Sequence, residues 1–389
     1  MTPSLALDSI EINNFRALRH LKLENLSRVN LIVGKNNVGK TTVLEAIWVY
    51  AQGGAPKALL EVLEGRNEAS LQTNGNGQSK AYTTKDQFAS LKYLTSLSKN
   101  HLDAAQNGSG FHPINISAGL NYPIIKYNLT IFVGPYKLTT SKDEVSGELT
   151  AEPEYNRGAE ESLLIMHDQK KFDYPLKSGK FLEVLRDNLN TPPPPTIERN
   201  AYFARVQGFD IDQLDARWDD LLLRDSANDI VGCLQIITPE IERIHLVPTP
   251  GQSHRQPFAK LAGLDEPVSL KSLGEGLNRL FGVAVILVQS KGGIALIDEI
   301  DTGLHYSVLP TFWNFVFKAA QRLNVQVFAT THSWDCIEGF SEALQSDEGF
   351  DGQLISLRRS REVDDDTIYP VSYDRQEIAI ATKSDIEVR

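Results

Sequence analysis

The segment from Gly34 to Thr41, Gly-Lys-Asn-Asn-Val-Gly-Lys-Thr, has the residue types and the spacing of a loop that could wrap a phosphate chain. Its glycines let backbone N–H groups approach a phosphate, the Lys40 ammonium group neutralises phosphate charge, and the Thr41 hydroxyl is a ligand for Mg²⁺. A helix expected to begin near Lys40 adds the positive end of its dipole. The pattern therefore predicts a nucleotide-binding loop. The candidate phosphate ligands are Gly34, Lys35, Asn36, Asn37, Val38, Gly39, Lys40, Thr41 and Thr42.

Two adjacent acids late in the chain supply the other half of such a site. The apolar stretch 293–297 is typical of a buried strand, and Asp298 and Glu299 follow it directly. Asp298 at a strand tip can hold the water shell of Mg²⁺, and Glu299 can polarise an attacking water molecule. Alone, the pair is equally consistent with the start of a solvated loop. Together with the phosphate loop, it predicts ATP hydrolysis with Thr41 and Asp298 as metal ligands.

Strands and helices alternate around both motifs. A short apolar strand precedes the phosphate loop and a helix follows it, and the same alternation resumes after residue 268. This order predicts a doubly wound α/β core, with an antiparallel β-subdomain at the N-terminus. The expected strands are 5–12, 18–23, 29–33, 293–297 and 325–330, and the expected helices are 43–48, 274–289 and 307–323.

The two motif-bearing parts are separated by about two hundred residues of different character. We expect a core formed by residues 1–55 and 265–389, interrupted by an α+β insertion lobe over residues 56–264. Glycine- and proline-rich stretches interrupt the insertion, and it lacks heptads, so a coiled coil is excluded. The expected elements of the insertion are a polar helix over 86–103, a hairpin over 122–140 turning at Gly134-Pro135, and two helical patterns over 211–237.

Composition limits the class of protein. The 389 residues carry 39 basic and 50 acidic side chains, a net charge of −11, which argues against non-specific coating of nucleic acid but leaves room for a local basic groove. Two cysteines without a CxxC motif argue against a disulfide scaffold or a zinc site. The apolar runs are shorter than the ~20 residues that span a bilayer, and no secretory signal is present. We therefore expect a cytoplasmic protein without a membrane partner.

Three further motifs carry a resemblance to a known family. Residues 272–276, Ser-Leu-Gly-Glu-Gly, resemble the signature motif of ABC-type ATPases in the variant used by SMC, RecF and OLD-like proteins. Residues 329–333, Ala-Thr-Thr-His-Ser, resemble the switch-histidine loop of that class, and residues 10–16 resemble its N-terminal strand. Within that class, the chain resembles the AAA15 group of OLD-like ATPases. This resemblance rests on residues 218–225, 237–244, 298–305 and 332–336.

The resemblance implies a P-loop ABC-type ATPase core and a set of roles. In such proteins two subunits sandwich two ATP molecules, so the signature residues Ser272, Gly274 and Glu275 would complete the site of a second copy of the chain. The resemblance also places an arginine, here Arg16, close to the nucleotide. With Lys40, the catalytic residues implied are Glu299 as the base for water and His332 as a γ-phosphate contact.

Some residues depart from the family pattern or have simpler explanations. His305 stands where transporter ATPases usually carry an aspartate, and the glutamine loop has only a weak candidate in Gln207. The basic cluster 358–361 could contact nucleic acid, but a solvated strand end is the favoured interpretation. Arg205 is interpreted as a surface or dimer contact. The other histidines lack metal-ligand spacing.

The resemblance suggests an ATP-driven switch in anti-phage defence or DNA metabolism. Only 57 residues follow His332, too few for the Toprim nuclease domain of OLD proteins, so the expected effector is a Toprim-like nuclease on another chain. This is similar to the split arrangement of the AriA ATPase in PARIS defence systems. The alternative is a RecF-like repair ATPase that clamps DNA. A transporter nucleotide-binding subunit would need a Leu-Ser-Gly-Gly-Gln signature, which the chain lacks.

Overall fold

The parallel sheet at the centre of the molecule carries the phosphate loop. In this computed structural model its strand order is β16-β15-β3-β14-β13-β9, with β16 the antiparallel member. The strands are β3 (Val29–Val33), β9 (Ala201–Ala204), β13 (Ile294–Ile297), β14 (Gln326–Thr330), β15 (Gly352–Arg359) and β16 (Ile368–Tyr373). Every residue of β3, β13 and β14 is buried, as expected for parallel strands covered on both faces.

The structure describes most of the chain but not all of it. The described residues are 5–66, 68, 113–121, 124–142, 149–156, 159, 161–167, 170–175, 188, 200–205, 218–219, 221–222, 226–248, 255–360, 367–384 and 388. The expected polar helix over 86–103 lies outside them.

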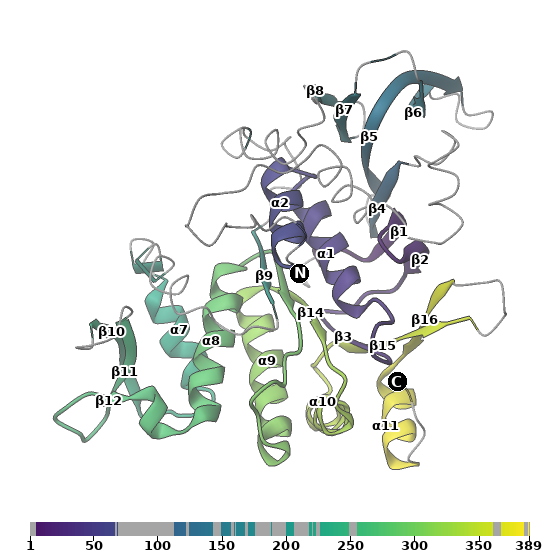
Figure 1. The fold of residues 1–389 in the computed structure, drawn as a ribbon. Coiled ribbons are helices and arrows are strands. Elements are labelled where there is room, and N and C mark those ends of the chain that lie inside the picture. Colours follow the sequence, from purple (N-terminus) through teal and green to yellow (C-terminus); the bar gives the residue numbers. More distant parts are fainter. Residues whose placement is uncertain are drawn as a thin grey trace, which may run out of the picture.

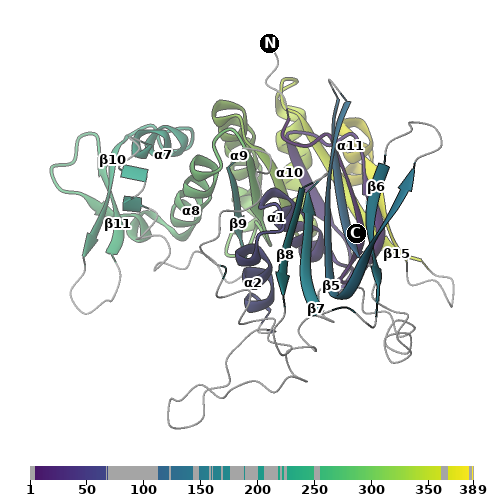
Figure 2. The same ribbon diagram turned by 90° about the horizontal axis from the view of Figure 1, so that it is seen from above.

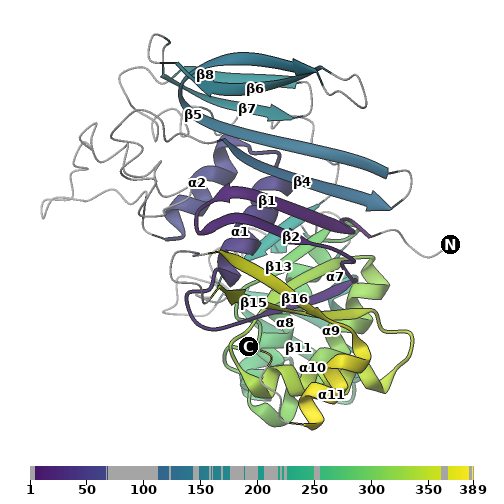
Figure 3. The same ribbon diagram turned by 90° about the vertical axis from the view of Figure 1, so that its right-hand side faces the viewer.

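Helices cover both faces of the parallel sheet, which confirms the doubly wound core (Figure 1). On one face lie α1 (Lys40–Ala51) and α2 (Pro56–Glu64). On the other lie α8 (Glu275–Gln289), α9 (Leu309–Leu323) and α10 (Trp334–Ser346), and Figure 3 shows the two sets on opposite sides. The remaining helices are α7 (Ala227–Leu234), α11 (Arg375–Lys383) and the 3-10 turns η2 (Leu270–Leu273) and η3 (Tyr306–Val308). None of the described helices is long and apolar enough to cross a membrane.

A second, antiparallel sheet packs against α1 and α2 (Figure 2). Its order is β2-β1-β4-β5-β7-β8, with β6 paired to β5. The strands are β1 (Ser9–Phe15), β2 (Leu18–Leu23), β4 (Ile114–Asn121), β5 (Ile124–Lys142), β6 (Leu149–Tyr155), β7 (Glu161–His167) and β8 (Lys170–Pro175). The sheet supplies the antiparallel β-subdomain expected from the sequence, and β1 and β2 form its N-terminal edge.

The expected hairpin over 122–140 is wrong, because β5 is one strand of 19 residues. Gly134 and Pro135 mark a change of partner rather than a turn: β5 pairs with β7 up to Pro135 and with β6 from Tyr136 onward. A proline has no N–H to donate to a ladder, so it is tolerated where the strand leaves one partner for another.

One strand of the core sheet comes from within the expected insertion. β9 pairs in parallel with β13 at the edge of the sheet, and α7 packs beside α8. A small sheet of β10 (Ile241–Pro248), β11 (Arg255–Leu261) and β12 (Val268–Ser269) lies next to α7, on the side away from the antiparallel sheet (Figure 2). A four-residue edge strand leaves almost no periodic signal, so the sequence could not place it.

Candidate functional site

The motifs meet because parallel strands end at the same edge of the sheet. β3 leads into Gly34, β13 into Asp298 and β14 into Thr331. Thr330 pairs with Ile32 and Ala329 with Ile297, so the three strand ends lie side by side. Segments more than 250 residues apart in the chain are thereby joined at one edge.

The backbone of the phosphate loop requires its glycines. Gly34 has φ +145° and Gly39 has φ +101°, and a Cβ on Gly34 would lie 2.7 Å from the carbonyl oxygen of Leu357. α1 begins at Lys40 directly after Gly39, without a side-chain cap, so its first N–H groups are available to an anion. Lys35, Asn36 and Asn37 are exposed. Val38 is buried in the apolar cluster that lies between the antiparallel sheet and α1.

Lys40 lies across the loop. Its Nζ donates to the carbonyl oxygens of Gly34 at 2.7 Å and Lys35 at 3.1 Å. Burial lowers the pKa of Lys40, and the nearby charges of Asp298 and Glu299 raise it in part. The ammonium group is therefore held among acceptors at the place where a phosphate would supply stronger ones.

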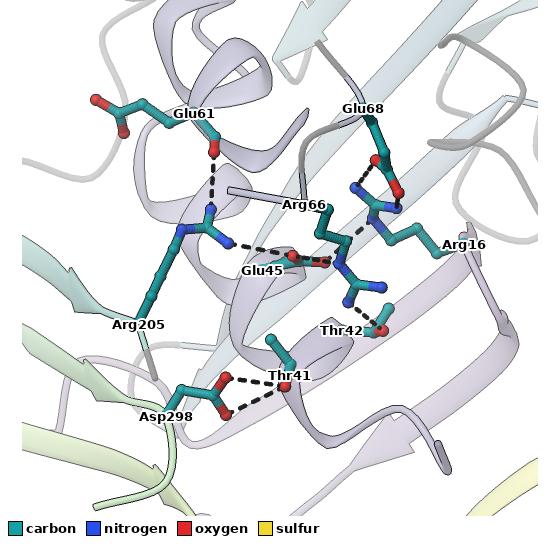
Figure 4. A network of polar contacts seen from close by, with 9 residues as sticks. All are labelled: Arg16, Thr41, Thr42, Glu45, Glu61, Arg66, Glu68, Arg205 and Asp298. Atoms are coloured by element: carbon teal, nitrogen blue, oxygen red, sulfur yellow. Dashed lines mark hydrogen bonds and ion pairs between the residues drawn. The ribbon is translucent and has the colours of Figure 1, made fainter. Parts of the chain in front are cut away.

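Thr41 and Asp298 are in direct contact, as the metal-site prediction requires (Figure 4). The Thr41 hydroxyl donates to Asp298 Oδ2 at 2.9 Å and lies 3.2 Å from Oδ1. Asp298 is 2% exposed, and among the described residues no lysine or arginine forms an ion pair with it. Burial raises the pKa of Asp298, while hydrogen bonds from Thr330 and Thr41 lower it. A hydroxyl beside a carboxylate that lacks a cationic partner fits the oxygen ligands that Mg²⁺ prefers.

Glu299 and His332 lie next to this pair. Glu299 has a left-handed backbone, with φ +46°, and its carboxylate lies 3.7 Å from His332 Nδ1. Thr302 donates to the second carboxylate oxygen at 3.4 Å. Both Glu299 and His332 are partly exposed, so they can reach a bound phosphate. The structure thus brings together the five predicted residues Lys40, Thr41, Asp298, Glu299 and His332.

The signature residues lie elsewhere on the core. Ser272 belongs to the 3-10 turn η2, Gly274 has φ +118°, and Glu275 begins α8. Figure 1 places this segment on the left of the molecule, apart from α1, and Ser272 and Gly274 are exposed. That these residues complete the site of a second copy stays a prediction.

Arg16 does not face the phosphate loop with a free guanidinium group. Its Nε lies 3.1 Å from Glu45 on α1, and its two terminal nitrogens donate to Glu68 at 2.9 and 2.7 Å. Glu45 follows Thr41 by one helical turn, so Arg16 contacts the helix that the phosphate loop begins; its closeness to a nucleotide stays a prediction. However, two carboxylates engage its charge.

Glu45 is the buried centre of an ion cluster, which we call the Glu45 cluster: Glu45, Arg16, Arg66 and Arg205 (Figure 4). Glu45 is fully buried, and Arg66 Nε and Arg205 approach its Oε1 at 2.8 and 3.4 Å. Arg66 also donates to Thr42 at 3.1 Å. The cluster ties three segments to the helix that follows the phosphate loop.

Arg205, interpreted from the sequence as a surface or dimer contact, has several partners within the chain. Besides Glu45, its guanidinium group bonds to the Glu61 carbonyl oxygen at 3.0 Å and lies 4.6 Å from the centre of the Phe203 ring. Sequence reasoning also missed Glu45 and Arg66. The usable signal was Glu45 itself, because a glutamate inside the apolar run 43–51 requires a cationic partner when the helix is buried.

Arg279 is another residue that the sequence did not single out. It lies on α8, and its terminal nitrogen donates to the carbonyl oxygens of Glu299 at 3.3 Å and Ile300 at 3.4 Å. Burial lowers the pKa of Arg279, and the charge of Asp301 opposes that shift. The contact links the helix of the signature motif to the turn that carries the acid pair.

The remaining expectations have mixed outcomes. Arg359, expected at a solvated strand end, donates to the carbonyl oxygen of Asn37 in the phosphate loop at 3.3 Å. His305 is exposed and lies 2.9 Å from the Ser307 hydroxyl. Gln207 lies outside the described residues. Cys233 and Cys336 are both free and buried, and no cluster of potential metal-binding His, Cys, Asp and Glu is found among the described residues.

Comparisons with known proteins agree with the motifs. A family model described as "AAA ATPase domain" matches residues 6–191, and one described as "AAA domain, putative AbiEii toxin, Type IV TA system" matches residues 227–335. An ATP/GTP phosphatase of Helicobacter pylori is 22% identical over 400 residues, covering 94% of this chain and 95% of the relative.

Two further likenesses are more limited. The DNA replication and repair protein RecF of Clostridioides difficile is 43% identical over 49 residues, 13% of each chain. The SMC head domain from Thermotoga maritima aligns with 95% of this chain and 100% of that chain, at 11% identity and a TM-score of 0.47. The two family models cover the phosphate loop and the acid pair, and the Helicobacter relative spans nearly the whole length. Together these matches support an ABC-type or AAA ATPase similar to the SMC, RecF and OLD group.

Proposed function

We propose that the chain hydrolyses ATP with Mg²⁺ at the edge where β3, β13 and β14 end. The observation that carries the proposal is the hydrogen bond between Thr41 and Asp298, which joins the phosphate loop to the acid pair across 257 residues. The name of the Helicobacter relative, an ATP/GTP phosphatase, supports the same reaction.

Each side chain has a role that its geometry permits. The loop amides and Lys40 bind the phosphates, and Lys40 exchanges its two carbonyl acceptors for phosphate oxygens. Thr41 and Asp298 would hold Mg²⁺, which supplies neutralisation of charge on the phosphate oxygens. Glu299 orients the attacking water and takes its proton, and His332 donates to the γ-phosphate.

We propose that this reaction drives a switch between separate and ATP-joined copies of the chain. Ser272 and Gly274 are exposed at the start of α8, where the positive end of a helix dipole can meet the γ-phosphate bound by a second copy. A homodimer with two shared ATP molecules, or a larger assembly, follows from this arrangement.

The biological setting we propose is anti-phage defence or DNA metabolism, with a Toprim-like nuclease on another chain as effector. The toxin–antitoxin description of the second family model supports a defence role. A second candidate is a RecF-like ATPase that clamps DNA, and the RecF likeness over 49 residues favours it. Stimulation of ATP turnover by duplex DNA alone would favour the second candidate over the first.

The test compares Lys40→Ala and Glu299→Gln with the wild-type chain. We expect Lys40→Ala to lose ATP binding, because it removes the cation of the loop. Glu299→Gln should bind ATP normally, release phosphate about 10²–10⁴-fold more slowly and accumulate an ATP-dependent dimer. Phosphate release and light scattering measure these outcomes. Normal ATP affinity in Lys40→Ala would overturn the site, and an unchanged mass of Glu299→Gln with ATP would overturn the switch.

A further inference from the structure

Thr330 lies where the phosphate-loop strand and the acid-pair strand are held together. It is the last residue of β14, between β3 and β13, and it is completely buried. It has no place in the hydrolysis scheme above, and its side chain does not reach solvent. It nevertheless forms hydrogen bonds with Asp298 and Glu299, the two acids of that scheme.

A single hydroxyl group serves both acids. Thr330 Oγ1 donates to Asp298 Oδ1 at 2.5 Å and accepts from the backbone N–H of Glu299 at 2.8 Å. The carbonyl oxygen of Thr330 accepts from the N–H of Ile300 at 3.0 Å. Three consecutive residues after β13 are thus held by one residue of the neighbouring strand.

These bonds determine how the Asp298 carboxylate is turned. A threonine hydroxyl has one proton to donate, and here it is committed to Oδ1, while the lone pair facing Glu299 is also occupied. Thr41 makes its shorter contact, 2.9 Å, to the other oxygen, Oδ2. Each carboxylate oxygen therefore has its own hydroxyl partner, which fixes the plane of the carboxylate relative to the phosphate loop.

The same hydroxyl stabilises an unusual backbone at Glu299. A left-handed φ of +46° is uncommon for a glutamate and persists only when surrounding contacts hold it. Two hydrogen bonds hold this backbone in place. The Glu299 N–H donates to Thr330, and Arg279 donates to the Glu299 carbonyl oxygen. The direction of the Glu299 side chain follows from this backbone.

We propose that Thr330 is a positioning residue for ATP hydrolysis: its buried hydroxyl sets the orientation of the metal-binding carboxylate and of the water-activating glutamate together. The proposal rests on the proposed function, because it assigns Thr330 a role only through Asp298 and Glu299. In this role Thr330 does not need to contact the nucleotide itself. A change at Thr330 should therefore affect turnover and the response to Mg²⁺ but leave ATP affinity unchanged.

The experiment uses three variants of the full chain. Thr330→Val keeps the shape and removes the hydroxyl, Thr330→Ser keeps the hydroxyl, and Thr382→Val makes the same chemical change in α11, where Thr382 bonds to Ile378 and Ser341. For each we measure kcat, the affinity for a fluorescent ATP analogue without metal, and the rise in unfolding midpoint when Mg²⁺ is added to the ADP-bound chain.

We expect Thr330→Val to lower kcat about 10–100-fold and to reduce the Mg²⁺-induced rise, with analogue affinity within about twofold of wild type. Thr330→Ser should restore most of the turnover, and Thr382→Val should match the wild type. A Thr330→Val variant with wild-type kcat, or a Thr330→Ser variant as slow as Thr330→Val, would overturn the proposal. If the wild-type chain itself released no phosphate from ATP, the proposed function would fail instead.

Discussion

Two buried carboxylates lie close to the phosphate loop, and they are stabilised in opposite ways. Glu45 is surrounded by three guanidinium groups, whereas Asp298 has two hydroxyl partners and, among the described residues, no cationic one. A buried charge with matched countercharges is a fixed part of the structure. A buried charge satisfied by hydroxyls alone still attracts a cation. The difference separates the carboxylate that holds the fold from the one that we propose binds metal.

The largest effect should come from removing the Glu45 charge. Glu45→Gln leaves three arginines around a neutral, fully buried amide, so we expect the free energy of unfolding to fall by about 3–5 kcal/mol. Urea unfolding monitored by circular dichroism measures it. Glu68→Gln is the matched control, because Glu68 also pairs with Arg16 but is partly exposed. Equal losses in the two variants would show that Glu45 is not the centre of the cluster.

Asp298→Asn should change the free energy of unfolding in the opposite direction, and raise it, when nucleotide and metal are absent. Burial raises the folded-state pKa of Asp298 above 3.8, so the contribution of this group to stability is complete below pH 3.8 and is lost as the pH rises through the folded pKa. Asparagine avoids that loss. We therefore expect the variant to be more stable than wild type at neutral pH.

The pH dependence is the decisive part of that prediction. The stability difference between Asp298→Asn and wild type should shrink as the pH falls toward 3.8 and stay constant above the folded pKa. Thermal unfolding at a series of pH values measures it. A variant that is less stable than wild type at every pH would remove the contrast with Glu45, since Asp298 would then also be a structural charge.

The smallest effect should come from the most exposed member of the Glu45 cluster. Arg66→Lys keeps a positive charge beside Glu45 but replaces two separate donor nitrogens, one for Glu45 and one for Thr42, with a single one, so we expect a loss of about 1 kcal/mol or less. The midpoint of urea unfolding reports it. A loss as large as that of Glu45→Gln would mean that the paired geometry, rather than the charge, stabilises the cluster.

The sequence predicts what depends on local pattern. The phosphate loop, the acid pair and the alternation of core strands were accessible because each is a short motif with a strong periodic or compositional signal. β9 and the long β5 were not, since a four-residue edge strand carries no period and a Gly-Pro pair is ambiguous between a turn and a change of partner.

The candidate site divides in the same way. Lys40, Thr41 and Asp298 follow from spacing, but Arg205 and Arg66 meet Glu45 only through the tertiary fold, across 160 and 21 residues. Thr330 lies inside a predicted strand and two residues before a predicted histidine. Its role depends on the register of β14 against β13, which a single sequence does not contain.

The contact between Thr41 and Asp298 also bears on how the protein is made. Its two partners are separated by 257 residues, so the phosphate loop leaves the ribosome long before the acid pair exists. Closing so long a loop has a high entropic cost, and the contact forms only after most of the chain has been synthesised. A nascent N-terminal fragment would have the loop without the carboxylate. If ATP and metal bind as proposed, they would therefore stabilise the finished chain but not its early fragments.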